Sequence, residues 1–325
     1  MKVVITGGAG FLGSRLAQAL LARGQLTGKS GRPEEIDELV LLDTSPTNVA
    51  DNRVRSIVGD IADAAVICDA IGDDTHSIFH LAAIVSGQAE ADFPLGMRIN
   101  LDATRALLEA CHALPASPRF VFASSVAVFG GALPEVVPEH FELNPQTSYG
   151  MQKTIGELLV NDFGRRGFVD ARAYRLPTIC VRPGKPNRAA SSFASGIIRE
   201  PLSGQDAECP VAPETRMWLS SPQTAIVNLI HGHEIDGNAL GFNRALSLPG
   251  LSVSVAEMID ALRSVAGEAV ASRIHFRRDE TIERLVASWP GALNTDRACA
   301  LGFMGDVDFR EIVRAHRADS KGSTG

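Results

Sequence analysis

The sequence predicts an α/β fold in which a doubly wound parallel sheet is joined to a smaller C-terminal lobe. Short apolar segments alternate with amphipathic helical segments over roughly the first half of the chain, the order that builds a parallel sheet covered by helices on both faces. The first apolar segment runs directly into a glycine-rich turn. With 325 residues, the chain is long enough for such a sheet domain and a second lobe.

The first strand, turn and helix form half of a βαβ unit. Residues Lys2 to Thr6 are mostly β-branched, and apolar residues recur at helical spacing from Phe11 to Ala22. Between them, Gly7, Gly10 and Gly13 form a Gly-x-x-Gly-x-x-Gly pattern. In a dinucleotide site such glycines permit a tight turn, close approach of a pyrophosphate and close packing of helix on strand. A glycine pattern alone is weak, because an ordinary tight turn also needs glycine.

An acidic residue ends the second strand. Residues Leu39 to Asp43 are apolar except for the final Asp43. A carboxylate at this place accepts hydrogen bonds from the adenosine ribose and repels a 2′-phosphate, so NAD is the predicted cofactor rather than NADP. The polar insertion from Thr27 to Glu38 is expected to be a surface loop. Together with the glycine turn, this strand predicts a Rossmann-type sheet.

Two further strands follow. Residues Val54 to Asp60 end in an acid that either meets the adenine amino group or caps the next helix. Residues Ser77 to Ala83 form a buried strand whose small final residues would let a cofactor lie across its end. His80 in this strand is expected to be packed in the core rather than reactive.

A tyrosine and a lysine four positions apart form the most reactive pattern in the chain. If the segment SYGMQK is helical, Tyr149 and Lys153 project from one face. A phenol with a pKa of about 10 is a poor base at neutral pH, and a nearby cation lowers that pKa. Ser125 follows the strand from Arg119 to Ser124. Because ligands bind at the carboxyl ends of parallel strands, Ser125, Tyr149 and the glycine turn should lie on one edge.

Composition and charge exclude several classes of protein. The formal net charge of −7 argues against a nucleic-acid or anionic-membrane surface. The five cysteines are odd in number and lack metal-like spacing, which predicts a reduced protein with no metal site. No stretch approaches the ~18 apolar residues of a membrane span, and we see no signal peptide. We therefore expect a cytoplasmic protein.

In the order and spacing of its motifs, the chain resembles the extended short-chain dehydrogenase/reductase family, which includes NAD-dependent sugar epimerases and dehydratases. The motifs are TGGAGFLG, Asp43, GDI, HLAA, Asn100, SSVAVFG, YGMQK and NTDRACALGF. The resemblance implies that Tyr149 is the general base and that Lys153 lowers its pKa and binds the ribose. It implies that Ser125 orients the reacting carbinol and that Asn100 holds a proton-relay water. Tyr149 would then take the hydroxyl proton while the cofactor accepts a hydride.

The same resemblance implies the extent of the two parts and their contacts. Residues 1–177 with about 217–248 would form the NAD-binding Rossmann domain, about 178–216 with 249–317 the substrate-binding lobe, and 318–325 a disordered tail. A homodimer would form through the helices at about 98–114 and 149–165. The residues expected to contact NAD are Gly7, Gly10, Phe11, Leu12, Gly13, Asp43, Asp60, Ile61, Leu81, Ala82, Ala83, Tyr149, Lys153, Pro177 and Ile179.

A closer likeness follows the tyrosine and lysine. Residues 172–184 read RAYRLPTICVRPG, and this run with the next twenty residues resembles four-carbon sugar-acid oxidoreductases of the family. A sugar acid carries a permanent carboxylate, so its pocket should offer a cation or several donors. Arg216 stands where sugar-nucleotide relatives grip diphosphate. The residues expected to contact substrate are Ser125, Tyr149, Thr178, Lys185, Asn187, Ser191, Ser192 and Arg216.

The expected activity is NAD-dependent oxidation of a secondary hydroxyl of a small sugar acid, foremost D-erythronate, to a 2- or 3-keto acid. The alternative is an NDP-sugar epimerase or dehydratase that holds its NAD tightly. Against it, Ser221 and Pro222 replace an acidic helix start, and two Trp and two Tyr offer little for stacking a base. A regulator without catalysis is disfavoured because Tyr149 and Lys153 are both present.

Overall fold

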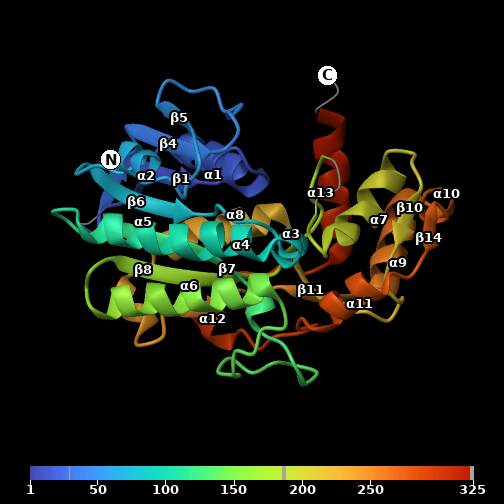
Figure 1. The fold of residues 1–325 in the computed structure, drawn as a ribbon. Coiled ribbons are helices and arrows are strands. Elements are labelled where there is room, and N and C mark those ends of the chain that lie inside the picture. Colours follow the sequence, from blue (N-terminus) through green and yellow to red (C-terminus); the bar gives the residue numbers. More distant parts are fainter. Residues whose placement is uncertain (29, 185–187, 323–325) are drawn as a thin grey trace.

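Seven parallel strands form the centre of the molecule (Figure 1). The computed structural model describes residues 1–28, 30–184 and 188–322. The strands of the sheet are β1 (Lys2–Thr6), β4 (Glu38–Asp43), β5 (Val54–Val58), β6 (Thr75–His80), β7 (Arg119–Ser125), β8 (Asp170–Leu176) and β12 (Ala245–Ser247). Their order across the sheet is β12-β8-β7-β6-β1-β4-β5, and every neighbouring pair is parallel. The predicted doubly wound α/β fold is confirmed.

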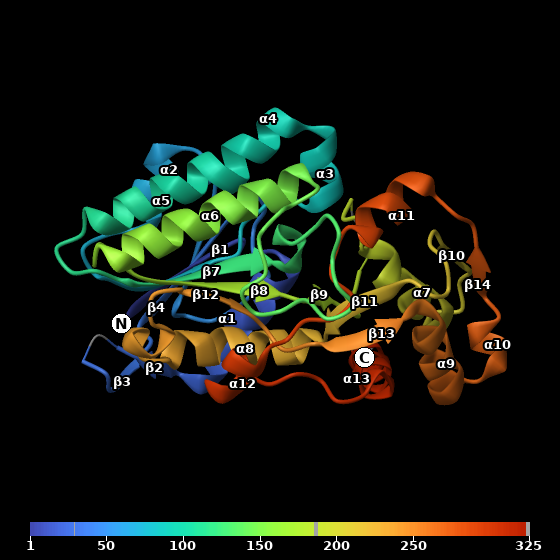
Figure 2. The ribbon, with the colours of Figure 1, turned by 90° about the horizontal axis from the view of Figure 1, so that it is seen from below.

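Helices cover both faces of this sheet, as Figure 2 shows. One face carries α2 (Ala64–Ala70), α5 (Ala103–His112) and α6 (Ser148–Arg165), and the other carries α1 (Phe11–Arg23), α8 (Pro222–Glu234) and α12 (Asp296–Ala300). Successive side chains of a strand point to opposite faces. Val3 and Ile5 therefore pack on the side of α1 and α8, and Val4 packs on the side of α5 and α6. One sheet thus separates two apolar cores.

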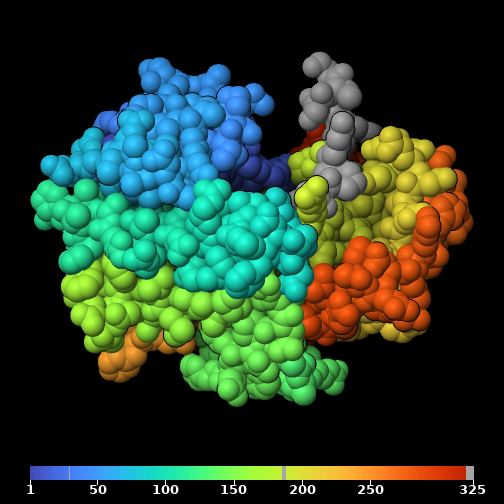
Figure 3. Space-filling model, viewed as in Figure 1, coloured from blue at the N-terminus to red at the C-terminus, as the bar shows by residue number. Residues whose placement is uncertain are grey.

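A smaller lobe lies beside the carboxyl ends of these strands and forms the yellow and orange region on the right of the space-filling view (Figure 3). Its strands are β9 (Thr178–Ile179), β11 (Arg216–Ser220) and β13 (Leu251–Ser254) in one sheet, and β10 (Ala207–Cys209) with β14 (Ile274–Phe276) in another. Its helices are α7 (Ser192–Leu202), α9 (Val255–Ala266), α10 (Glu268–Ala271), α11 (Glu280–Ala287) and α13 (Phe309–Gly322). Met217 and Leu219 of β11 belong to the apolar core of this lobe. The chain therefore remains in this lobe past residue 217, the expected boundary, and returns to the sheet domain at α8.

The connecting segments differ from the expectations in three places. The segments not yet named are β2 (Gln25–Thr27), β3 (Pro33–Glu35), α3 (Ser86–Ala91), α4 (Phe93–Gly96), the π-helical η1 (Met97–Asp102), and the 3-10 helices η2 (Val126–Val128) and η3 (Gly237–Leu240). The expected surface loop contains the antiparallel pair β2 and β3, which buried Leu26 and Ile36 anchor. The helix expected over residues 98–114 begins with the π-helical η1. Helix α13 continues to Gly322, into the tail expected to be disordered, and residues 323–325 lie outside the described residues.

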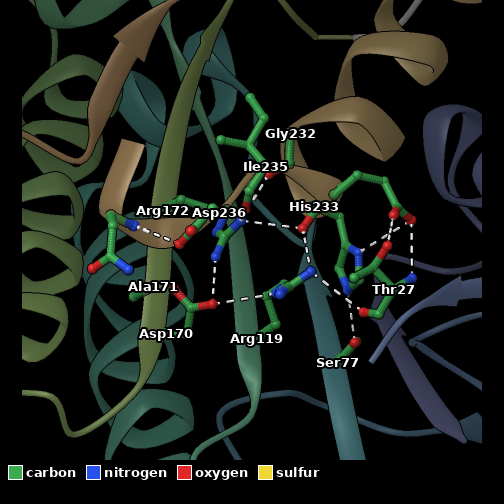
Figure 4. A network of polar contacts seen from close by, with 12 residues as sticks. Thr27, Ser77, Arg119, Asp170, Ala171, Arg172, Gly232, His233, Ile235 and Asp236 are labelled. Carbon is green, nitrogen blue, oxygen red and sulfur yellow. Dashed lines mark hydrogen bonds and ion pairs between the residues drawn. The ribbon is translucent and has the colours of Figure 1, made fainter. Parts of the chain in front are cut away.

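A buried arginine ties the end of α8 to the sheet (Figure 4). Arg172 of β8 is fully buried, and its Nη1 donates to the carbonyl oxygens of Gly232, His233 and Ile235 at 3.0, 3.1 and 2.7 Å. The last carbonyls of a helix lack partners within the helix, and a cation there is favourable. Asp170 pairs with the same guanidinium at 2.5 Å and balances its charge. This network secures the sheet at the amino ends of its strands.

Within the part of the chain that the structure describes, no helix is both long enough and apolar enough to cross a membrane.

Candidate active site

A cavity of about 510 Å³ opens at the carboxyl ends of the central strands. Its lining comes from the turn between β1 and α1, the ends of β4, β6 and β7, the start of α6 and the segment that enters the lobe. Every residue that the sequence predicted to contact NAD lies on this lining. Trp289 of the smaller lobe also lines the cavity.

The turn between β1 and α1 has the shape that a phosphate group requires. Gly7 has a φ of +73°, and a Cβ there would lie 2.9 Å from the backbone nitrogen of Ala82. A Cβ at Gly13 would overlap the carbonyl oxygen of Gly7. Gly10 precedes α1 without a side-chain cap, and the first turn of the helix holds no acidic residue. The amides of this helix N-terminus are therefore suited to an anionic diphosphate.

Two carboxylates lie at the same end of the cavity. Asp43 ends β4 and accepts a hydrogen bond from the backbone nitrogen of Ala9, in the glycine turn, at 3.1 Å. Asp60 pairs with Arg98 at 2.6 Å, a contact that the sequence analysis did not foresee. The side chain of Asp63 caps α2, which removes helix capping as the role of Asp60.

Tyr149 and Lys153 lie in the first turns of α6, and both line the cavity together with Ser125 at the end of β7. Thr147 caps this helix, so the chain begins to coil just before the tyrosine. The Nζ of Lys153 lies 5.8 Å from the centroid of the Tyr149 ring and donates to the carbonyl oxygen of Ala123 at 2.8 Å. The structure thus brings Tyr149, Lys153 and Ser125 together at one edge of the sheet, where the sequence analysis expects them.

Burial governs the protonation of this pair. It raises the pKa of Tyr149 to about 12, while a side-chain hydrogen bond with Ser125 and the charge of Arg182 act to lower it. Burial also lowers the pKa of Lys153 to about 7, against the opposing charge of Glu157. Loss of hydration outweighs the nearby charges, among which the charge of Arg182 acts to lower the pKa of the phenol. That Lys153 lowers the pKa of Tyr149 stays a prediction.

Asn100 lies behind the cavity wall. This buried residue of η1 accepts a hydrogen bond from the backbone nitrogen of Ile84 at 2.7 Å. Its Nδ2 donates to the carbonyl oxygen of Ile84 at 3.0 Å and to Oε1 of Gln152 at 2.8 Å. These contacts fix the loop after β6 against the residue that precedes Lys153.

The residues expected to contact substrate fall into three groups: on the cavity lining, off it, and outside the described residues. Four of them line the cavity: Ser125, Tyr149, Thr178 and Ser191. Lys185 and Asn187 lie outside the described residues. Ser192 begins α7 and is not on the lining.

Arg216 does not face the cavity. Its Nη1 donates to the carbonyl oxygen of Ser252 at 3.2 Å and pairs with Glu257 at 3.4 Å, and the side chain is exposed. Arg216 starts β11, where it pairs with Ser254 of β13. It lies off the cavity lining in this structure, and its contact with substrate stays a prediction.

The cavity also contains a cation that the sequence analysis missed. Arg182 follows β9, lines the cavity and donates to Oγ of Ser191 at 3.1 Å. The signal that could have found it is an arginine directly after the apolar run from Ile179 to Val181.

Residues 3–220 match the NAD dependent epimerase/dehydratase family. The chain belongs to this family, and NAD is its cofactor. The resemblance found in the order of the sequence motifs is confirmed.

Individual relatives match over nearly the full length. The D-erythronate dehydrogenase of Cupriavidus necator is 59% identical over 321 residues, which cover 98% of this chain and 99% of that protein. The D-erythronate dehydrogenase of Haemophilus influenzae is 47% identical over 318 residues, which cover 97% and 98%. A crystal structure described as the nucleoside-diphosphate-sugar epimerase from Agrobacterium tumefaciens is 44% identical, with a TM-score of 0.90 and coverage of 99% of this chain and 95% of that chain.

Proposed function

We propose that this protein is an NAD-dependent dehydrogenase that oxidises a secondary hydroxyl of D-erythronate to the 2- or 3-keto acid. One observation carries the proposal: a single cavity is lined both by the glycine turn and by Ser125, Tyr149 and Lys153. A cofactor on the turn and a substrate beside Tyr149 would share that enclosure. The full-length similarity to two D-erythronate dehydrogenases supports the choice of substrate.

The lining fits NAD at several points. The N-terminus of α1 would hold the diphosphate, and Asp43 would accept hydrogen bonds from the adenosine ribose. Pro177 and Ile179 would form part of the wall beside the nicotinamide, and both line the cavity. When bound, NAD supplies the acceptor for the hydride that leaves the carbinol carbon.

The protein's own side chains would handle the proton. Tyr149 acts as the general base that removes the hydroxyl proton. The hydrogen bond with Ser125 and the charge of Arg182 both favour its phenolate. Ser125 also holds the substrate oxygen and aligns the carbinol. Lys153 stands next to the tyrosine ring, fixed by its hydrogen bond to the carbonyl oxygen of Ala123.

An NDP-sugar epimerase is the second candidate, and the description of the 44% identical structure favours it. The position of Arg216 speaks against it. In the described structure this residue points to Ser252 and Glu257 instead of lining the cavity, so it is not placed to bind a diphosphate there.

The deciding experiment is a substrate screen. Purified protein is incubated with NAD and C4 to C6 aldonates, or with UDP-galactose and related nucleotide sugars, and NADH is followed by absorbance. Sugar products are followed by chromatography in the same samples. We expect NADH from aldonates, with D-erythronate best. Epimerised nucleotide sugar without net NADH would refute the dehydrogenase.

We further propose that the protein acts as a homodimer in the cytoplasm. Helices α5 and α6 lie side by side on the outer side of the sheet (Figures 1 and 2), and the Leu158 side chain on α6 is 63% exposed. A second copy placed on these helices would cover that apolar surface. All five cysteines are free, which suits a reducing compartment.

A further inference from the structure

We propose that Arg182, assisted by Ser191, binds the carboxylate of the substrate. The inference rests on the proposed function, because it names the residue that would make the cavity selective for an acid over a neutral polyol. The sequence did not decide which of several cations contacts the carboxylate, and the structure distinguishes between them.

The backbone of Arg182 is held from both sides, and its guanidinium is held by Ser191. The backbone nitrogen of Arg182 donates to Oγ of Ser195 at 2.9 Å, and its carbonyl oxygen accepts from Nη1 of Arg199 at 2.7 Å. Its Nη2 donates to Oγ of Ser191 at 3.1 Å, and both side chains line the cavity. Ser191 is buried and precedes α7 without capping that helix through its side chain. The arrangement is a fixed pair of polar side chains at the cavity wall.

Charge balance distinguishes Arg182 from the other cations on the described lining. Arg98 is paired with Asp60 at 2.6 Å. Lys153 donates to a carbonyl oxygen and lies one helical turn from Glu157. Among the residues that the structure describes, no carboxylate lies within 4.0 Å of the Arg182 guanidinium. A half-buried cation without a carboxylate partner is a favourable place for an anionic ligand.

The location of Arg182 also suits a small substrate. Arg182 and Tyr149 line the same cavity, and the charge of Arg182 acts to lower the pKa of the phenol. In a four-carbon acid the reacting hydroxyl is only one or two carbons from the carboxylate. The acidic residues Asp43 and Asp60 lie at the glycine-turn end of the lining. An acid would therefore be directed toward Arg182 and away from those carboxylates.

The test compares an acid with its neutral isostere. D-erythronamide keeps the carbon chain and hydroxyls of D-erythronate but carries no charge. In Arg182→Met we expect KM for D-erythronate to rise about 10- to 100-fold, because a charged hydrogen-bonded pair is lost. The preference for acid over amide in kcat/KM should fall by the same factor. Ser191→Ala should cause a smaller change in the same direction, and Arg182→Lys should restore part of the preference.

Arg277→Met is the matched control, since it removes an exposed arginine of the same lobe that pairs with Glu208 at 3.0 Å and lies off the cavity. It should leave both the acid preference and KM unchanged. Arg182 also acts on the Tyr149 phenol, so Arg182→Met should change kcat and its pH profile equally for the acid and for the amide. The ratio of the two substrates removes that shared effect. Thermal unfolding of each variant establishes that the fold is intact.

Activity and calorimetric binding measurements together distinguish failure of this inference from failure of the proposed function. No NADH from any aldonate with the wild type would refute the proposed function. D-erythronate binding to NAD-loaded Tyr149→Phe should weaken when Arg182→Met is added. Unchanged binding or an unchanged acid-to-amide ratio would overturn the carboxylate site. A rise in the Kd of NAD that accounts for the whole effect would assign Arg182 to a cofactor phosphate instead.

Discussion

Arg175 holds Glu157 with two parallel hydrogen bonds, one helical turn beyond Lys153. Nε of Arg175 donates to Oε1 of Glu157 at 2.9 Å, and Nη2 donates to Oε2 at 2.7 Å. The two side chains are only 6% and 3% exposed, and Ser124 adds a hydrogen bond to the same carboxylate at 2.5 Å. Glu157 opposes the lowering of the Lys153 pKa by burial. The pair thus connects β8 of the sheet to the electrostatics of Lys153, the neighbour of the candidate base.

Glu157→Gln should lower the pKa of Lys153 further below its ordinary value and destabilise the fold. Removing one partner of a buried ion pair costs about 3–5 kcal/mol, because the other charge stays buried. Urea unfolding measures the stability, and the pH dependence of lysine labelling measures the pKa. The double variant Glu157→Leu with Arg175→Met should recover much of the loss. Simple addition of the two single losses would contradict this account.

Tyr149→Phe should abolish turnover and keep NAD binding. Loss of a positioned general base reduces the rate by about 10²- to 10⁴-fold, while the glycine turn and Asp43 are untouched. Stopped-flow NADH formation and calorimetric binding of NAD check both parts. Tyr174→Phe is the matched control, since Tyr174 is fully buried and donates to the carbonyl oxygen of Gly232 at 2.7 Å. Wild-type turnover in Tyr149→Phe would end the proposed mechanism.

Asp43→Ala should erode the preference for NAD over NADP. The carboxylate would no longer accept ribose hydroxyls or repel a 2′-phosphate, so kcat/KM should fall with NAD and rise with NADP. Steady-state kinetics with both cofactors give the ratio. Asp63→Ala, which removes only the cap of α2, should cost about 1 kcal/mol of stability and leave the ratio alone. An unchanged ratio in Asp43→Ala would show that this acid serves another purpose.

Stability should fall as the pH drops from about 6.5 toward 4, because two buried histidines are neutral. Burial lowers the pKa of His80 to about 3 and that of His233 to about 4, from the ordinary histidine value of 6.5. In the folded state these histidines stay neutral at pH values where the unfolded state already binds protons. The stability that the neutral histidines contribute is therefore complete above pH 6.5 and is lost as the pH falls below it. At pH 5 each of the two histidines should lower the free energy of unfolding by about 2 kcal/mol.

Urea unfolding at pH 7.5 and pH 5 measures that loss. His233→Gln should remove roughly half of it. His275→Gln changes a histidine whose side chain is 60% exposed, and it should leave the pH dependence as in the wild type. Equal pH dependence in His233→Gln and the wild type would count against the buried neutral histidine.

Leu158→Glu should convert a dimer into a monomer, because a charge would be buried where two copies meet. Size-exclusion chromatography with light scattering measures the mass. Val307→Glu changes a side chain that is 86% exposed near the start of α13 and should not alter the mass. A monomeric wild type, or a dimer that survives Leu158→Glu, would reject α6 as the interface.

The cofactor half of the site could be predicted from sequence because its geometry is local. The glycine turn, Asp43 and the tyrosine with its lysine each depend on one strand end or one helix, and parallel strands bring these ends to the same edge. The protonation of Tyr149 could not be predicted. It depends on how completely the phenol loses water and on Arg182, which belongs to the other lobe.

The substrate half depended on contacts between distant segments. The lobe pairs β11 with β13 antiparallel and with β9 parallel, an order that the linear spacing of these strands does not reveal. That pairing takes Arg216 away from the cavity, whereas the path of the chain after β9 leaves Arg182 on its lining. Both are arginines next to apolar runs, so sequence alone gave no ground to choose.

The sequence by itself determined the doubly wound sheet, the glycine turn for NAD and the pairing of Tyr149 with Lys153, because strand and helix periodicity and fixed short spacings specify them. Only the tertiary structure decided which arginine lies on the cavity lining and in which direction burial moves the pKa of Tyr149. Those properties arise from strand register and loss of hydration, which are set when distant segments pack together.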